Sequence, residues 1–273
     1  MPFLFHPDIS DWSSWGSVYQ SIDDWKPLIR HIYSLHTLPL SEVEPLTPGT
    51  NAVFRVGDTV VKIFAPAESG LDTQSDFSTE LFGLRRADAL GIAVPHLHAD
   101  GCVRDKYAFH YMVMDHIAAS SLSDIGGTLT AAEKEAVGHL LRDICDRMNG
   151  PCAPFNSVNV VERAQSSARW NGFSPDFIRE KNRWLTQHRP AECVFVHGDL
   201  NPDNLLIDPT GNIHVIDFAD SVRAPADYEL AAIVCEAFAF DASYMRGFFG
   251  ADYAVSDITD RLFHALLLHD FGA

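Results

Sequence analysis

The chain has 273 residues, 47% of them hydrophobic, and its 37 acidic against 20 basic side chains give a formal net charge of −17. A chain of this length and apolar content can bury a large core and commonly divides into two lobes. The negative charge argues against nucleic acid or an anionic membrane as partner, because their phosphates demand a basic surface. It favours a cationic small molecule, although acidity alone also promotes solubility.

Five scattered cysteines without a CxxC pair offer no pattern for structural zinc or a redox disulfide, and we expect reduced thiols. The N-terminal segment MPFLFHPDIS lacks a basic n-region and a small-residue cleavage site. Nowhere do eighteen apolar residues follow one another. We therefore expect a cytoplasmic protein, and we expect it to be a monomer or a weak dimer.

The first regular pattern is helical spacing of apolar residues over 21–38, where Pro27 is tolerated only in the first turn. A β-hairpin follows, with strands over 52–56 and 59–64 and a two-residue Gly-Asp turn. Lys62 lies in the second strand and faces opposite to its two apolar neighbours. Its ammonium group is therefore either solvated or directed at a ligand.

Two segments near this hairpin could act together with Lys62, one as a phosphate-covering loop and one as the source of a paired carboxylate. The loop Pro48-Gly49-Thr50-Asn51 precedes the hairpin, and its backbone N–H groups at Thr50 and Asn51 could cover phosphates. The stretch 75–90 is helical, ended by Gly and then Pro, and Asp76 and Glu80 lie in its first half. We expect Glu80 to pair with Lys62; Asp76 as the partner, or a solvated Glu80, are the alternatives.

The middle of the chain continues with strands around 94–99 and 107–114. Thr130 and Glu133 then form a capping box, and the apolar face that follows predicts a long helix ending before Gly150. The residues over 153–189 are rich in aromatic and charged side chains, and we expect a helical insert there without a defined register.

The most informative stretch has the sequence VFVHGDLNPDNLLIDPTGNIHVIDFAD. Its last two β-runs, at 205–208 and 213–216, are joined by Pro-Thr-Gly-Asn, which predicts a hairpin. Because both strands of a hairpin end on the same side, Asn204 and Asp217 should lie near Asp199. Mg²⁺ prefers such oxygen ligands from one or two protein groups, with phosphate and water completing its coordination. This chemistry suits phosphoryl transfer.

HGDLNPDN followed by IDFAD resembles the catalytic and metal-binding loops of the aminoglycoside phosphotransferase family, distant relatives of protein kinases. The likeness extends over most of the chain, through the segments DWKPLIRH, TPGTNAVF, VVKIF, YMVM and LLHDF. It implies an α+β, bilobal protein-kinase-like fold. Residues 1–115 would form a small β-rich N-lobe with a helix, and residues 116–273 a larger, mainly helical C-lobe. Similar proteins are expected to continue beyond Ala273.

The resemblance also implies roles for the loop residues. Asp199 would be the catalytic base, and Asn204 and Asp217 would hold Mg²⁺; the step from Asp199 to Asn204 matches the spacing of the protein-kinase catalytic loop. Lys62 would reach the phosphates of ATP, with Glu80 as its partner. His197 is expected to tie the loop to the backbone without a chemical role.

Further residues are assigned by the same resemblance. At the hinge, the backbone around Asp115 and Ile117 would bond the adenine edge, and Met114 would border its pocket. Asp227 is expected to be the N-cap of the next helix, at the position where the family has an acid that supports the catalytic loop. Three later acids could together hold a polyamine acceptor, although each taken singly is interpreted as a solvated or helix-pairing charge: Asp220, Glu236 and Asp241.

The expected activity is transfer of the γ-phosphate of ATP, with GTP as the alternative nucleotide, to a hydroxyl of an aminoglycoside or aminocyclitol antibiotic. Hygromycin B is the expected acceptor, and antibiotic resistance the expected role. The alternatives are a kinase of another hydroxylated metabolite, such as choline, homoserine or a macrolide, and a catalytically dead binding module. Retention of Lys62, Asp199, Asn204 and Asp217 argues against the last, because binding alone does not need the complete set.

Overall fold

A computed structural model describes residues 2–47 and 49–271 of the chain. The chain divides into two compact units, unit 1 with Met1–Ser78 and Pro95–Ile117 and unit 2 with Thr79–Val94 and Ala118–Ala273. Pro48, the first residue of the predicted phosphate-covering loop, lies outside the described residues. Along the residues that are described, no helix is both long and apolar enough to cross a membrane.

Unit 1 is built on an antiparallel sheet that, in its described part, has five strands in the order β1-β2-β3-β5-β4. The strands are β1 Val43–Pro45, β2 Ala52–Val56, β3 Thr59–Ile63, β4 Leu97–Arg104 and β5 Ala108–Asp115. The predicted hairpin is confirmed as β2 and β3, and Gly57 in its turn has a φ of 64°, which glycine adopts without steric cost.

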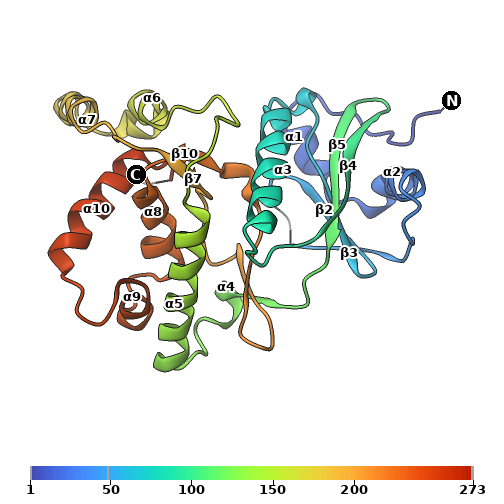
Figure 1. Cartoon of the computed structure of the whole chain (residues 1–273). Coiled ribbons are helices and arrows are strands. Elements are labelled where there is room, and N and C mark those ends of the chain that lie inside the picture. The colour runs from blue at the N-terminus through green and yellow to red at the C-terminus, as the bar shows by residue number, and fades with distance from the viewer. Residues whose placement is uncertain (1, 48, 272–273) are drawn as a thin grey trace. The chain divides into compact units, whose positions relative to one another are not determined.

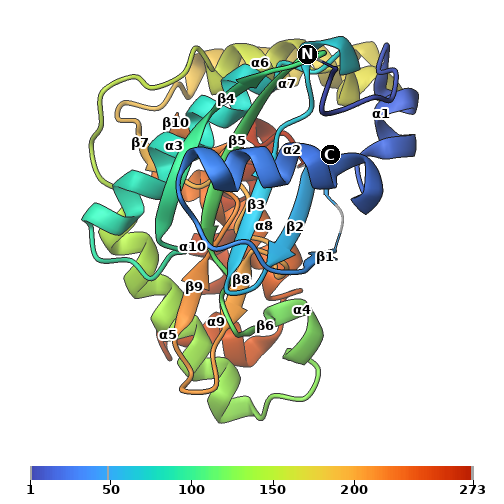
Figure 2. The same cartoon turned by 90° about the vertical axis from the view of Figure 1, so that its right-hand side faces the viewer.

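Two helices, α1 Trp12–Val18 and α2 Ile22–Leu35, contribute to the core of unit 1. Helix α2 lies across one face of the sheet (Figure 2). Its fully buried Trp25 meets the rings of Phe5 and Phe109 with centroid distances of 4.4 and 5.2 Å. The apolar spacing over 21–38 thus predicted a real helix, whereas α1, which has only seven residues, was not predicted.

Pro27 lies within α2, in its second turn, and not in the first turn where it was expected to be tolerated. At that position the ring removes one intrahelical hydrogen bond, because the nitrogen of Pro27 has no hydrogen to donate. Burial of Trp25, Leu28 and Ile29 on both sides of the proline holds the helix on the sheet, and this packing offsets the lost bond.

Helix α3, Thr73–Ala89, confirms the helix predicted over 75–90. Its first turns belong to unit 1, where the Phe77 ring packs edge-on against Phe64 at 5.4 Å. Its remaining turns belong to unit 2, where a Cβ on Gly83 would come within 2.7 Å of the Phe218 Cβ. A side chain at position 83 would therefore push α3 away from Phe218.

Unit 2 is mainly helical. Helix α5, Ala131–Met148, begins at the predicted capping box of Thr130 and Glu133 and packs beside α9, Ala242–Phe249 (Figure 1). The two helices approach closely because each contributes a glycine: a Cβ on Gly138 or Gly247 would overlap a backbone oxygen of the other helix. The other helices of unit 2 are α4 Leu122–Ile125, α6 Val160–Ser166, α7 Pro175–Gln187, α8 Leu230–Ala232 and α10 Val255–Leu268.

Small antiparallel sheets in unit 2 flank the loops that contain Asp199, Asn204 and Asp217. One pairs β7 Val194–Val196 with β10 Val222–Ala224, and the other joins β6 Ser120–Ser121, β8 Leu205–Ile207 and β9 Ile213–Val215. The hairpin of β8 and β9 is the one that the sequence predicted. The described chain therefore has the expected α+β composition, with an N-terminal antiparallel sheet and a mainly helical C-terminal part.

Candidate active site

The loop after β7 presents the carboxylate of Asp199, whose two oxygens accept hydrogen bonds from two side-chain amides. Asn201 donates Nδ2 to both oxygens at 3.0 Å, and Asn204 donates Nδ2 to Oδ2 at 2.9 Å. The Asn204 Nδ2 also donates to the Asp199 backbone carbonyl at 2.9 Å. Since the amide nitrogen of Asn204 is turned toward Asp199, its carbonyl oxygen points to the other side. That oxygen could bind a cation.

Asp217 follows β9 at the same end of the hairpin. The Ile216 N–H donates to the Asn204 carbonyl at 3.2 Å, so the residue before Asp217 is bonded directly to Asn204. Asp217 itself is exposed and adopts a left-handed conformation with φ 62° and ψ 72°. Among residues with a Cβ, aspartate and asparagine adopt this region most readily. The hairpin thus brings Asn204 and Asp217 together beside Asp199.

The electrostatics of this loop are dominated by like charges. Burial, together with the negative charges of Asp220, Asp217 and Glu236, raises the pKa of Asp199 to about 7, while the Asn201 amide opposes the shift. The carboxylates of Asp220 and Glu236 therefore lie close enough to Asp199 to disfavour its ionised form. A cation bound among these groups would relieve their repulsion.

Asp241, the third acid expected near an acceptor, is engaged elsewhere in unit 2. It is the N-cap of α9, where it accepts a hydrogen bond from the Ser243 N–H at 2.8 Å, and it forms an ion pair with Lys134 at 2.8 Å. These contacts favour the alternative considered for Asp241 from the sequence, that of a helix-pairing charge.

The predicted phosphate-binding residues of unit 1 lie in and beside β3. Lys62 is 7% exposed and pairs across the sheet with Val53 and Met112, and its Nζ lies 5.4 Å from the centre of the Phe64 ring. Thr50 is exposed and its carbonyl accepts from the Trp15 indole at 2.9 Å.

Asn51, in contrast to Thr50, is buried, and its Oδ1 accepts from the Ala65 N–H at 3.2 Å. The side chain of Asn51 therefore ties the start of β2 to the chain that leaves β3. The loop is thus held through the carbonyl of Thr50 and the side chain of Asn51.

The residues expected at the hinge lie at the end of β5. Met114 is buried, whereas Asp115 and Ile117 are partly exposed. The N–H of Asp115 donates to the His96 carbonyl at 2.9 Å, and its carboxylate bonds to the His98 ring at 2.7 Å. The Asp115 N–H is therefore used within unit 1 and is not a donor that a nucleotide could reach.

Glu80 on α3 belongs to unit 2 and is 3% exposed, whereas Asp76 is half-buried. A carboxylate as deeply buried as that of Glu80 is stable in its charged form only beside a counter-charge or hydrogen-bond donors. Of Asp76 and Glu80, Glu80 is therefore the one whose burial calls for a counter-charge or hydrogen-bond donors.

The acid that supports the loop of Asp199 is Glu229, and the prediction of Asp227 was wrong. Glu229 is 1% exposed and accepts hydrogen bonds from the N–H groups of His197 at 2.6 Å and Gly198 at 3.1 Å. Asp227 lies inside a 3-10 turn, is not a helix N-cap, and binds Arg261 at 2.5 Å. The two acids are only two residues apart, so the course of the turn decides which one faces the loop.

His197 holds the same loop through its ring. Its Nε2 bonds to the Ile216 carbonyl at 3.0 Å, and its Nδ1 accepts from the Asp199 N–H at 3.2 Å. The ring therefore ties the Asp199 loop to the end of β9, which is the structural role expected for it. Asn201, by contrast, was missed, although it lies inside the motif and its only signal was a short polar side chain beside Asp199.

Gly198 allows the loop to approach the segment after Asp217. Its φ is +84°, and a Cβ at this position would overlap the backbone carbonyl oxygen of Asp220. We expect Gly198→Ala to lower the free energy of unfolding by more than about 2 kcal/mol, because left-handed strain and a backbone overlap add together. Gly211→Ala is the matched control, since Gly211 has a φ of +89° but open space around it. Equal losses in urea unfolding of the two variants would contradict the steric explanation.

The contribution of Asp199 and Glu229 to the stability of the ligand-free protein should fall as pH rises. Burial raises the pKa of both Asp199 and Glu229 to about 7, above the value of about 4 in an unfolded chain. Between these values the two groups bind more protons in the folded state, so their contribution to the free energy of unfolding is complete below about pH 4 and is lost by about pH 7. We expect the melting temperature of Asp199→Asn, relative to that of the wild type, to rise between pH 5 and pH 8. Asp260→Asn, at an exposed acid of α10, should keep the wild-type pH dependence; the wild-type pH dependence in Asp199→Asn would refute this account.

Oxygen ligands for a divalent cation are available at this loop. Asn204 offers an amide oxygen and Asp217 an exposed carboxylate, beside the negative charges that raise the pKa of Asp199. Among the described residues, no three His, Cys, Asp or Glu side chains are arranged to hold a metal by themselves. Oxygen donors of this kind are ones that Mg²⁺ accepts, with phosphate and water as its further ligands.

An N-terminal antiparallel sheet with a buried lysine, and a helical unit with an Asp-x4-Asn loop followed by a hairpin and a further Asp, define a kinase-like small-molecule phosphotransferase. Residues 42–262 match the phosphotransferase enzyme family, and the chain belongs to that family. It is therefore an enzyme, a small-molecule kinase, as the sequence indicated. No curated protein matches the chain at a significant level.

Solved structures with the same fold share little sequence with this chain. The GDP complex of aminoglycoside 2′-phosphotransferase-IIIa has 16% identity and a TM-score of 0.67, over 91% of this chain and 88% of that one. The streptomycin–ATP complex of APH(2″)-IIa has 13% identity and a TM-score of 0.60, over 88% of each chain. The choline kinase LicA from Streptococcus pneumoniae has 17% identity and a TM-score of 0.56, over 89% of each chain. The kinase-like fold is thereby confirmed.

Proposed function

We propose that this enzyme transfers the γ-phosphate of ATP to a hydroxyl group of a cationic aminoglycoside or aminocyclitol, with Asp199 as the catalytic base. The observation that carries this proposal is the group of carboxylates around Asp199, namely Asp217, Asp220 and Glu236, whose charges raise its pKa. Negative charge of this density suits a site that receives a metal cation and a positively charged acceptor together.

Asp199 would accept the proton of the acceptor hydroxyl while the oxygen of that hydroxyl attacks the γ-phosphorus atom of ATP. The amides of Asn201 and Asn204 orient the carboxylate for this step. A pKa of about 7 in the ligand-free protein is suited to proton transfer at neutral pH, because a base works best when its pKa is close to the working pH.

The carbonyl oxygen of Asn204 and the carboxylate of Asp217 would hold Mg²⁺, which neutralises phosphate charge when bound. In unit 1, the buried Lys62 is proposed to hold the α- and β-phosphates of the nucleotide, under the backbone of Thr50 and Asn51. In unit 2, Glu80 is 3% exposed, and its burial calls for a counter-charge or hydrogen-bond donors beside it.

For the acceptor we propose hygromycin B. The segments DWKPLIRH, TPGTNAVF, YMVM and LLHDF resemble hygromycin-B 7″-O-phosphotransferase. Choline is the second candidate, because a choline kinase is among the structures with this fold and choline is also a cation. Both acceptors are cations and suit an acidic site. They differ in the number of positive charges that each molecule carries.

The test is incubation of the purified protein with Mg·ATP and a panel of hygromycin B, other aminoglycosides, choline, homoserine and a macrolide, with products identified by mass. A phosphorylated aminoglycoside supports the proposal. Efficient phosphorylation of choline, homoserine or the macrolide without any aminoglycoside product would overturn the acceptor while leaving the kinase intact.

Charge neutralisation tests where a polycationic acceptor binds. We expect Asp220→Asn and Glu236→Gln to raise the acceptor KM more than they lower kcat, because these charges bind ground state and transition state alike. Salt should raise the acceptor KM more steeply than the KM for Mg·ATP. Asp241→Asn is the matched control, since that carboxylate is paired with Lys134. An effect of Asp241→Asn as large as that of Asp220→Asn would contradict this placement.

A further inference from the structure

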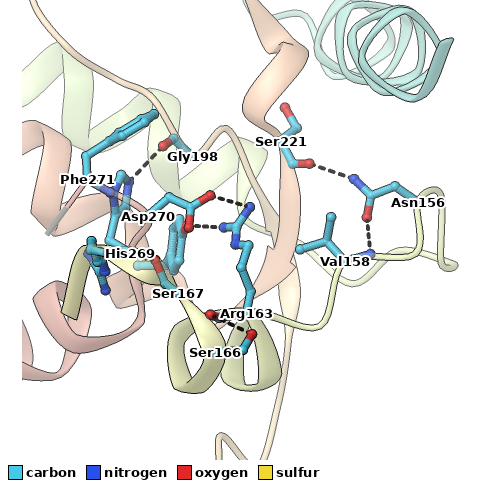
Figure 3. A network of polar contacts seen from close by, with 12 residues as sticks. Asn156, Val158, Arg163, Ser166, Ser167, Gly198, Ser221, His269, Asp270 and Phe271 are labelled. Carbon is cyan, nitrogen blue, oxygen red and sulfur yellow. Dashed lines mark hydrogen bonds and ion pairs between the residues drawn. The ribbon is translucent and has the colours of Figure 1, made fainter. Parts of the chain in front are cut away.

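The carbonyl oxygen of Gly198 accepts a hydrogen bond from a histidine at the end of α10. His269 is 1% exposed, and its Nε2 lies 2.8 Å from the Gly198 oxygen (Figure 3). The Phe271 N–H donates to the Nδ1 of the same ring at 3.1 Å. Because Nδ1 accepts, the ring proton is on Nε2 and His269 is the donor to Gly198.

Side chains from separate elements hold this ring in place. The His269 ring packs on the Tyr228 ring with a centroid distance of 4.5 Å. The Tyr228 hydroxyl accepts from Arg163 Nη2 at 2.5 Å. Arg163 Nη1 also forms an ion pair with Asp270 at 3.0 Å (Figure 3). Through Arg163, helix α6 thus holds both Tyr228, on which the His269 ring packs, and Asp270, the residue after His269. Burial lowers the pKa of His269 to about 4, so the neutral donor form persists at neutral pH.

The two polar backbone groups of Gly198 are therefore both bonded to buried side chains. Its N–H donates to Glu229 at 3.1 Å, and its carbonyl accepts from His269. That carbonyl belongs to the peptide that joins Gly198 to Asp199, so its direction determines where the Asp199 backbone begins. Gly198 has no Cβ to restrain the rotation of this peptide, and its φ of +84° is one that glycine adopts readily.

We propose that His269 is a positioning residue that orients the Gly198–Asp199 peptide and, through it, the Asp199 carboxylate. This inference rests on the proposed function of Asp199. Removing the donor leaves a buried carbonyl oxygen without a partner, and rotation of the peptide toward another donor relieves that cost. Such a rotation displaces the carboxylate, and displacements of about 1 Å from a productive geometry can slow a reaction about a hundredfold.

The test compares two substitutions of His269. His269→Phe keeps an aromatic ring beside Tyr228 but removes the donor, whereas His269→Gln places an amide N–H close to the position of Nε2. We expect kcat of His269→Phe to fall about 10-fold to 100-fold with a small change in the KM for Mg·ATP, and His269→Gln to recover most of it. His264→Phe, at a partly buried histidine of the same helix, is the matched control and should retain the wild-type kcat.

A second readout does not depend on turnover. Hydrogen exchange of the His197 and Gly198 amides, which donate to Glu229, should be faster in His269→Phe than in His264→Phe or His269→Gln. His269→Asn carries an amide one methylene shorter, which does not reach the Gly198 oxygen, and replaces His269→Phe if that variant does not fold.

Different results test the proposed role of Asp199 and the proposed role of His269. Near-wild-type turnover of a folded Asp199→Asn overturns the proposed function of Asp199. Full turnover and unchanged amide exchange in folded His269→Phe, beside an inactive Asp199→Asn, overturn the positioning role alone. Equal impairment of His269→Gln and His269→Phe also overturns it, because the donor would then not be what matters.

Discussion

Replacement of Asp199 by asparagine is expected to lower turnover by about a hundredfold or more, the usual scale for loss of a general base. The substitution keeps the size of the side chain and one oxygen that can accept from Asn201 or Asn204. It removes the group that could take up the hydroxyl proton. The residues of unit 1 proposed to bind the nucleotide are untouched, so calorimetry should show nearly unchanged affinity for Mg·ATP.

Asp203→Asn is the matched control for this prediction, because Asp203 is an exposed acid of the same loop, four residues further along. It should retain most of the wild-type turnover with the acceptor that the panel identifies. Both variants are to be compared at equal folded fraction, as measured by circular dichroism. Turnover of Asp199→Asn within a few-fold of wild type would remove Asp199 from the mechanism.

Asp217→Ala is expected to abolish the Mg²⁺-dependent part of nucleotide binding and the activity together. The carboxylate of Asp217 is the charged ligand of the proposed site, and a neutral amide oxygen from Asn204 does not replace it. Calorimetric titration with ATP in the presence of Mg²⁺ and of EDTA should give different affinities for the wild type and the same weak affinity for the variant.

Asp217→Asn refines this experiment, because asparagine also adopts the left-handed conformation found at position 217 and keeps one oxygen ligand. Its loss of Mg²⁺-dependent affinity should lie between those of the wild type and the alanine variant. Asp260→Ala, on the exposed side of α10, serves as the control for a general effect of charge. Unchanged Mg·ATP affinity and rate in Asp217→Ala would place the metal elsewhere.

The sequence alone determined those features in which the interacting groups are close along the chain. Local backbone preferences and short spacings determine three such features. These are the turn at Gly57, the capping box of Thr130 and Glu133, and the hairpin that joins Asn204 to Asp217. The motif from His197 to Asp220 has the same local character, which is why the kinase-like fold and the family could be predicted from it. The roles of Asp199, Asn204 and Asp217 remain proposals.

Only the tertiary structure decided which side chains from distant segments meet these loops. Glu229 supports the loop where Asp227 was predicted, because a 3-10 turn there directs one acid inward and the other toward Arg261. His269 reaches Gly198 from seventy-one residues away, and Asp241 turns to Lys134. Pro27 is accepted inside a helix because packing on the sheet outweighs the missing bond. Such contacts depend on burial and on the direction of each side chain in the folded chain, which no local pattern specifies.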